Sequence, residues 1–498
     1  MQLLKKIPFF LVLLVVFFCL HGSVENYGYL NAVEVMEVGG IAILCIAVFL
    51  AITWLFTRDL LFASLVCFFI ALWYLFFGVI HDVIKATSFL QFLQSYTVLL
   101  PALLVFNILV IWWIKRIRKQ HKKIALYLNL LFLLFCITDA VLITIKYFNY
   151  KDAALTPAVN FNTAAVKQKP NVYFLLFDEY AGYKSLQDSF GFKNDSFYHF
   201  LQQQQFKELP GFANYDFTPF SMSSILNMQY VPENYQKHKL TQPDIQQRFG
   251  EIRNARVFSI FKELGYTIEN NSIFDIKGNP ALYRYNGLFP THAGLLTNKI
   301  FHNRAFKNIG WWFITGKFKM TFLQDYFFYR KDAYNLEVEK AVQKSMKAKQ
   351  PQPKFCYAHF FLPHGQFYRD SAGNFNTPEQ INDLKYLADK SLYLSYLKYT
   401  NNIIANLVKE LNSNDPGAIV IIMSDHGFYD YDNPGDYDPY NFDNICFLRF
   451  PAGMQQEGKT PGSNVNFFRY FFNNGFGQNF PFVKDSTIFV IEDPDVLR

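Results

Sequence analysis

Residues 171–179, NVYFLLFDE, decide how the second half of this chain folds. Residues 171–177 form an apolar run of strand length, typical of a strand buried on both faces of a parallel sheet. Similar runs follow at 354–361 (KFCYAHFF), 418–423 (AIVIIM) and 444–450 (NICFLRF), with helical patterns between them at 253–264 and 390–411. Strands that alternate with helices predict an α/β sandwich with a largely parallel central sheet.

The first 150 residues differ from this pattern because they are crowded with long apolar runs. A helix needs about 20 apolar residues to cross a bilayer core of about 30 Å. Five segments meet or approach that length: 7–22, 39–57, 60–80, 96–114 and 124–147. We therefore expect a transmembrane domain of about five helices at 1–150. A small, polar, proline-containing stretch at 151–170 is expected to be a linker, and 171–498 a globular domain.

Basic residues predict the orientation of these helices. Lys5 and Lys6 precede the first run, Arg58 lies between the second and third, and a basic cluster at 115–123 lies between the fourth and fifth. The alternate loops carry one Lys and no Arg. By the positive-inside rule the N-terminus is cytoplasmic and the globular part lies outside. Asp139 lies deep in the last run, either as a functional group or as an interior partner for a polar neighbour; we favour the second interpretation.

Composition excludes some classes of function. The formal charge is +7, and the globular part has no long Lys/Arg stripe, so a nucleic-acid partner is not expected. The six cysteines show no CxxC pair or zinc-finger spacing. Cys356 and Cys446 lie in apolar strand-like segments, where two buried free thiols are favoured over a disulfide.

Polar residues follow three of the predicted strands, where ligands bind in open parallel sheets. Asp178 and Glu179 follow the first strand, and the pair Asp425 and His426 follows 418–423. His364 lies just beyond 354–361. Each residue alone has an ordinary structural explanation, but their convergence on one edge predicts a divalent metal site, with Zn²⁺ or Mn²⁺ as the favoured ion.

A hydroxyl-rich segment supplies candidate nucleophiles. Residues 214–231, NYDFTPFSMSSILNMQYV, place Thr218 and three serines where a helix is expected to begin. The N-terminus of a helix favours an anion such as phosphate or sulfate. An ordinary helix cap followed by serines explains this segment equally well.

Together these motifs resemble the alkaline phosphatase and sulfatase superfamily. NVYFLLFDEY resembles its opening strand with an acidic ligand, and IIMSDHG resembles its late strand that ends in Asp-His-Gly. NYDFTPFSMSSILNMQY, LGYTIENNS and HFFLPHGQF resemble the membrane-bound branch, which includes lipoteichoic acid synthases and lipid A phosphoethanolamine transferases. The likeness spans about 170–451.

The resemblance implies a role for each candidate residue. Asp178, Asp425 and His426 would bind the metal together with Thr218, which would also be the nucleophile, and Glu179 is a further candidate ligand. His364 would contact the transferred group. The segment Thr218–Met222 lacks the Cys-x-Pro-x-Arg motif, so formylglycine sulfatase chemistry is not expected.

The implied function is transfer of a phosphoethanolamine- or glycerophosphate-like headgroup from a phospholipid to an envelope glycan or lipid through a Thr218 intermediate. The implied location is the bacterial cytoplasmic (inner) membrane, with a multi-pass anchor and a periplasmic catalytic domain. Two alternatives stay open: a phosphatase, phosphodiesterase or sulfatase-like hydrolase, and a non-catalytic envelope scaffold. The donor, the acceptor, the number of metals and the oligomeric state do not follow from the sequence.

Two further segments have ordinary explanations. The aromatic and basic run 311–330 could dip towards lipid headgroups, but buried core with snorkelling cations is favoured. The aspartate-rich tract 429–440 does not have EF-hand spacing and is expected to be a solvated loop.

Overall fold

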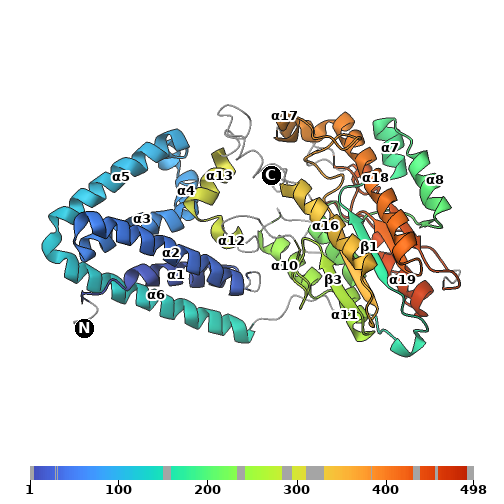
Figure 1. Ribbon diagram of the computed structural model, residues 1–498, viewed down its shortest axis with the longest axis horizontal. Coiled ribbons are helices and arrows are strands. Elements are labelled where there is room, and N and C mark those ends of the chain that lie inside the picture. Colours follow the sequence, from blue (N-terminus) through green and yellow to red (C-terminus); the bar gives the residue numbers. More distant parts are fainter. Residues whose placement is uncertain are drawn as a thin grey trace. The chain divides into compact units, whose positions relative to one another are not determined.

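The computed structural model divides the chain into two compact units (Figure 1). One unit contains Met1–Lys151 and Arg284–Trp311, and the other contains Asp152–Tyr283 and Trp312–Arg498. The structure describes residues 5–27, 30, 32–149, 159–232, 240, 242–282, 294–309, 330–382, 384–429, 438–454 and 458–490.

The first unit is helical, as the apolar runs predict. Its helices are α1 (Phe10–Glu25), α2 (Ala32–Thr57), α3 (Leu60–Leu75), α4 (Phe77–Ala86), α5 (Tyr96–Arg116), α6 (His121–Asn149), α12 (Gly294–Thr297) and α13 (Phe301–Ile309). Within the described residues, α2, α5 and a stretch that includes α6 are long and apolar enough to cross a membrane. The bent pair α3–α4 would be a fourth span. Helix α1 is apolar but has only 16 residues, so its crossing stays a prediction.

Two buried polar side chains of α6, Asp139 and Asn129, have partners on or next to α1. Asp139 of α6 is buried, and its Oδ2 lies 3.3 Å from Nδ1 of His21 on α1. About three turns earlier on α6, Asn129 accepts a hydrogen bond from the Phe10 amide at the start of α1 and donates one to the Ile7 carbonyl just before it. This geometry supports the interpretation of Asp139 as an interior partner for a polar neighbour.

A short segment from the second half of the sequence belongs to the helical unit. Residues 294–309, which contain α12 and α13, lie in sequence between strands of the other unit. Phe301 packs edge-on against Phe77 with ring centroids 4.8 Å apart, and the Gly78 amide donates to the Lys299 carbonyl at 2.7 Å. The domain boundaries expected from the sequence instead assign these residues to the globular domain at 171–498.

The second unit is built on one six-stranded sheet in the order β2-β6-β5-β1-β4-β3. The strands are β1 (Val172–Phe177), β2 (Lys207–Glu208), β3 (Thr267–Asn271), β4 (Lys354–Phe360), β5 (Ile419–Met423) and β6 (Cys446–Arg449). The helices are α7 (Tyr183–Phe190), α8 (Asp195–Gln203), α9 (Thr218–Asn227), α10 (Gln242–Arg253), α11 (Arg256–Glu263), α16 (Arg330–Lys347), α17 (Pro378–Asn382), α18 (Lys390–Asn414) and α19 (Phe467–Phe476).

The sheet is largely parallel, as predicted. Strands β3, β4, β1 and β5 run parallel, whereas β6 pairs antiparallel with β5, and β2 pairs antiparallel with β6. The apolar run at 444–450 is therefore a strand, β6, but it runs antiparallel to β5. Its first residue, Cys446, lies opposite the last residue of β5, Met423. Helices α9, α11 and α19 share one hydrophobic core with alternate residues of β1, and α16 packs on β4. A sheet covered in this way forms the expected α/β architecture (Figure 1).

Part of the predicted linker is packed rather than solvated. Val159 is buried in the core of the second unit, and Asn162 exchanges two backbone hydrogen bonds with the side chain of Gln478. Cys356 and Cys446 are buried free thiols, which confirms the prediction for this pair. Most of the aromatic run 311–330 and of the acidic tract 429–440 lies outside the described residues.

Candidate metal centre and active site

Two neighbouring strands place two aspartates side by side at their carboxyl ends. Strands β1 and β5 are parallel, with Leu176 opposite Met423. Asp178 and Asp425 each lie two residues further on, so the same register sets them opposite each other. Alternation along a strand also directs both towards the face that carries Leu176 and Met423. The register of β1 and β5 therefore brings the carboxylates of Asp178 and Asp425 together as a pair.

Asp178, Asp425 and His426 form a buried cluster in which one ligand atom of each residue lies within 4.8 Å of the others. His426 Nε2 lies 3.5 Å from Asp425 Oδ2 and 3.8 Å from Asp178 Oδ1. Those two carboxylate oxygens accept no hydrogen bond from the described part of the chain. A buried oxygen without a partner is costly, and a cation between the two would satisfy both. The three side chains therefore fit a divalent metal ion.

The electrostatics of the cluster point the same way. Burial opposes ionisation of Asp178, but the positive charge of His364 and a hydrogen bond with His359 hold the pKa of this carboxyl well below its usual range. Burial also disfavours a charged His426, yet Asp425, Asp178 and Glu179 raise its pKa to about 9. Without a metal, the cluster therefore attracts positive charge as a proton. A bound metal would replace that proton, because a ligating imidazole is neutral.

Thr218 lies at this cluster. It is the first residue of α9, and its Oγ1 is 3.3 Å from His426 Nε2. The N-cap position belongs to Phe217, which makes no side-chain capping bond, so Thr218 is not the ordinary cap that the sequence left open. Ser221, one turn later, donates to the Asp425 carbonyl at 2.6 Å and fixes the helix start against the strand end. A hydroxyl at a helix N-terminus beside candidate metal ligands is suited to attack a phosphate or sulfate ester.

Glu179 and His364 lie beside the cluster and face each other. The Glu179 backbone is left-handed (φ 60°), and its amide donates to Asp425 Oδ1 at 3.2 Å. Its buried carboxylate accepts from the Tyr429 amide at 3.0 Å, and Oε2 lies 3.7 Å from His364 Nε2. Burial raises the pKa of Glu179. The His364 side chain is 27% exposed, which makes it the more accessible of the two and suits contact with a substrate.

The sequence interpretation missed one residue of this site, His359 in β4. His359 is fully buried, with Nε2 3.3 Å from Asp178 Oδ2 and Nδ1 3.3 Å from the Tyr357 hydroxyl. It lies in an apolar strand rather than beyond its end, so a search of the residues after each strand passes over it. A histidine inside a strand buried on both faces is itself the signal that could have found it.

We expect His359→Ala to weaken metal binding by about 10- to 100-fold, because Asp178 would lose the group that orients its second oxygen. Metal titration of the full-length protein measures the dissociation constant, and melting temperature separates this effect from general unfolding. His359→Gln should restore part of the affinity, and His199→Ala on the exposed face of α8 should have no effect. Equal affinity in His359→Ala and the wild type would contradict this role.

Gly427, next to His426, lies where no side chain fits. A Cβ there would stand 2.3 Å from the Tyr440 carbonyl oxygen and 2.5 Å from that of Asp443. We expect Gly427→Ala to lower the stability of the full-length protein by at least about 2 kcal/mol, because the backbone beside His426 must move. Thermal melting measures the loss. Gly417→Ala, with open space around its Cβ, is the matched control, and equal melting points of the two variants would refute the prediction.

Several solved structures are similar to the chain. The C-terminal periplasmic domain of EptC from Escherichia coli in complex with Zn is 14% identical, with a TM-score of 0.38, over 65% of this chain and 87% of that one. The integral membrane protein lipooligosaccharide phosphoethanolamine transferase A (EptA) from Neisseria meningitidis is 12% identical, with a TM-score of 0.39, over 94% of each chain. A putative sulfatase from Bacteroides thetaiotaomicron is 13% identical, with a TM-score of 0.39, over 64% of this chain and 73% of that one. Likeness at this level identifies neither substrate nor reaction.

The family comparison is more direct. No curated protein matches the chain by sequence. Residues 255–472 match the Sulfatase family model, a range that includes His359, His364, Asp425 and His426 but begins after Asp178 and Thr218. The fold places those two residues at the same cluster. Residues 255–472 therefore carry a Sulfatase-family domain, and the first unit contains helices long and apolar enough to cross a membrane.

Proposed function

We propose that this protein is a metal-dependent, membrane-bound transferase that moves a phospho-headgroup from a phospholipid to an envelope glycan or lipid. The headgroup would be phosphoethanolamine- or glycerophosphate-like. One observation carries the proposal: the Thr218 hydroxyl lies 3.3 Å from His426, beside two buried carboxylate oxygens that have no hydrogen-bond partner in the described residues. This arrangement offers a nucleophile and a cation site within reach of one phosphate group.

Asp178, Asp425 and His426 would hold the metal, with Thr218 Oγ as an added ligand and Glu179 as a further candidate. Zn²⁺ and Mn²⁺ are the favoured ions. When bound, such a cation lowers the pKa of a neighbouring hydroxyl and neutralises charge on phosphate oxygens. Glu179 faces His364, and its carboxylate would also help to orient that imidazole.

Transfer would proceed in two displacements at phosphorus. In the first, Thr218 Oγ forms a bond to phosphorus, the bond from phosphorus to the glycerol oxygen of the lipid breaks, and diacylglycerol leaves with the threonine proton. In the second, an acceptor hydroxyl attacks phosphorus, the Thr218–phosphorus bond breaks, and the acceptor proton returns to Thr218. His364 would hydrogen-bond a phosphate oxygen in both steps.

The apolar helices support a lipid donor and an envelope acceptor. A catalytic domain joined to membrane helices meets phospholipid headgroups at high local concentration. Because the basic residues favour a cytoplasmic N-terminus, 171–498 would lie on the extracytoplasmic side of the bacterial inner membrane. A hydrolase that uses water as acceptor shares every residue of this site, and a scaffold would retain the fold without turnover.

The mass of the peptide that contains Thr218 tests the proposal. Full-length protein purified from bacterial membranes is digested and compared with its Thr218→Ala variant. A covalent adduct on Thr218 is expected, and its mass identifies the transferred group. Hydrolysis of phosphate esters without an adduct would favour the hydrolase. No adduct, no bound metal and no turnover would leave only the scaffold.

A further inference from the structure

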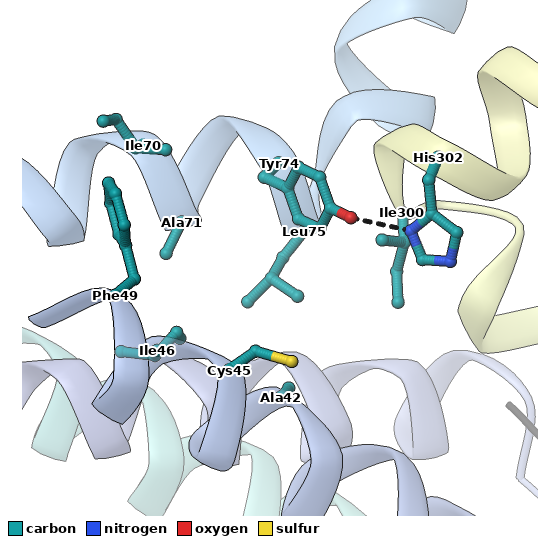
Figure 2. A pocket seen from close by; sticks show the side chains of 10 residues that line it. All are labelled: Ala42, Cys45, Ile46, Phe49, Ile70, Ala71, Tyr74, Leu75, Ile300 and His302. Carbon is teal, nitrogen blue, oxygen red and sulfur yellow. Dashed lines mark hydrogen bonds between the residues drawn. The ribbon is translucent and has the colours of Figure 1, made fainter. Parts of the chain in front are cut away.

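The helical unit contains an apolar cavity of about 270 Å³ that the proposed chemistry does not use (Figure 2). Helices α2 and α3 form its long walls, and Ile300 and His302, from the segment 294–309, close one end. All of these elements belong to the first unit. Helix α2 is long and apolar enough to cross a membrane, so its surroundings there are lipid.

The cavity is elongated along α2. The α2 residues that line it are Ala42, Cys45, Ile46 and Phe49. Their spacing of three, four and seven residues places them on one helix face. From Ala42 to Phe49 this face is about 10 Å long. That length is about two thirds of one leaflet of a bilayer whose apolar core is about 30 Å thick. Phe49 and Ile70 lie at one end of the cavity, and Tyr74 and His302 lie at the other (Figure 2).

The two ends differ in polarity. At one end the Tyr74 hydroxyl and His302 Nδ1 lie 2.8 Å apart, whereas the side chains at the other end are aliphatic or aromatic (Figure 2). Burial lowers the pKa of the His302 imidazole and so favours its neutral form. A neutral phenol and imidazole suit ester or glycerol oxygens.

Tertiary contacts hold the end wall in place. Lys299, beside Ile300, forms an ion pair with Glu25 at the end of α1. Arg304 forms another with Asp82 of α4. A Cβ on Gly78 would stand 2.8 Å from the Lys299 Cα, so only glycine permits this close approach. The end wall of the cavity is therefore anchored to α1 and α4.

We propose that this cavity binds one acyl chain of a membrane phospholipid, with the ester oxygens of that lipid at Tyr74 and His302. An acyl chain has the required narrow, apolar shape, and the polar end of the cavity matches the end of the chain that is esterified. The identification of this lipid as the headgroup donor rests on the proposed function. The existence of the binding site does not rest on it.

Photolabelling tests the site directly. Full-length protein in liposomes receives a phosphatidylethanolamine whose acyl chain carries a diazirine, and labelled peptides are identified by mass after irradiation. We expect more label on residues 42–49 and 70–75 than on 104–109 of α5, whose side chains are largely exposed and report ordinary surrounding lipid. Equal labelling of the two surfaces would overturn the proposal.

Filling the cavity provides the matched test. Ala71→Phe adds a ring to one wall and should lower the labelling ratio at least about fivefold, and Ala42→Phe from the opposite wall should act alike. Ala51→Phe, on an exposed position of α2, should leave the ratio unchanged. If wild-type labelling is specific but no transfer occurs, the proposed function fails and the lipid site stands. If transfer occurs without specific labelling, only the lipid site fails.

Discussion

Replacing Thr218 with alanine should lower turnover by at least about 10³-fold, because the variant loses the group that would form the covalent bond to phosphorus in the proposed mechanism. Metal content should stay near the wild-type value, since Asp178, Asp425 and His426 would hold the cation without this hydroxyl. Release of diacylglycerol from phospholipid in liposomes measures turnover. Elemental analysis of the same preparation measures the metal.

Thr218→Ser is the matched variant for this prediction. It keeps a hydroxyl 3.3 Å from His426 and removes only a methyl group, so it should retain turnover within about tenfold of the wild type. Full activity in Thr218→Ala would rule out the two-step scheme. A loss of metal together with activity would mean instead that the hydroxyl is required as a ligand.

Replacing Asp425 with asparagine should remove both the metal and the activity. Asp425 Oδ2 is one of the two buried oxygens without a hydrogen-bond partner in the described residues, and it lies 3.5 Å from His426 Nε2. Loss of this charge should weaken metal binding more than the roughly 10- to 100-fold typical of groups that only orient a ligand. We therefore expect little metal in the purified variant and a loss of turnover as large as that of Thr218→Ala.

Asp415→Asn is the control, because Asp415 lies just before β5 whereas Asp425 lies just after it. Asp415 accepts hydrogen bonds from Asn171 and Tyr173 at the opposite edge of the sheet. This variant should keep its metal, although its stability falls by about 1 kcal/mol through weaker hydrogen bonds. Wild-type metal content in Asp425→Asn would show that the cluster is not the metal site.

Much of the site was predictable because the candidate ligand residues directly follow the apolar runs that form strands. Apolar runs mark β1, β4 and β5, and polar residues at the end of a parallel strand share one edge of the sheet. Asp178, Asp425 and His426 indeed meet there, and Thr218 joins them. Their roles in catalysis stay predictions.

Other features depended on which elements pair in space. The antiparallel direction of β6 depends on its pairing with β5, which a run of apolar residues does not specify. His359 became part of the site only because β4 lies next to β1, with His359 opposite Leu176. Its distance from Asp178 is a property of the sheet order and not of either segment alone.

The sequence by itself therefore determined the local structure: membrane-length helices, buried strands and the acidic and imidazole groups at their ends. These follow from apolar length, periodicity and turn chemistry, which act over a few residues. Only the tertiary structure decided the register that pairs two carboxylates, the position of His359, and the packing of 294–309 beside α2 and α3. Those contacts join residues more than a hundred positions apart, and they form because the folded chain buries apolar surface that no segment can bury alone.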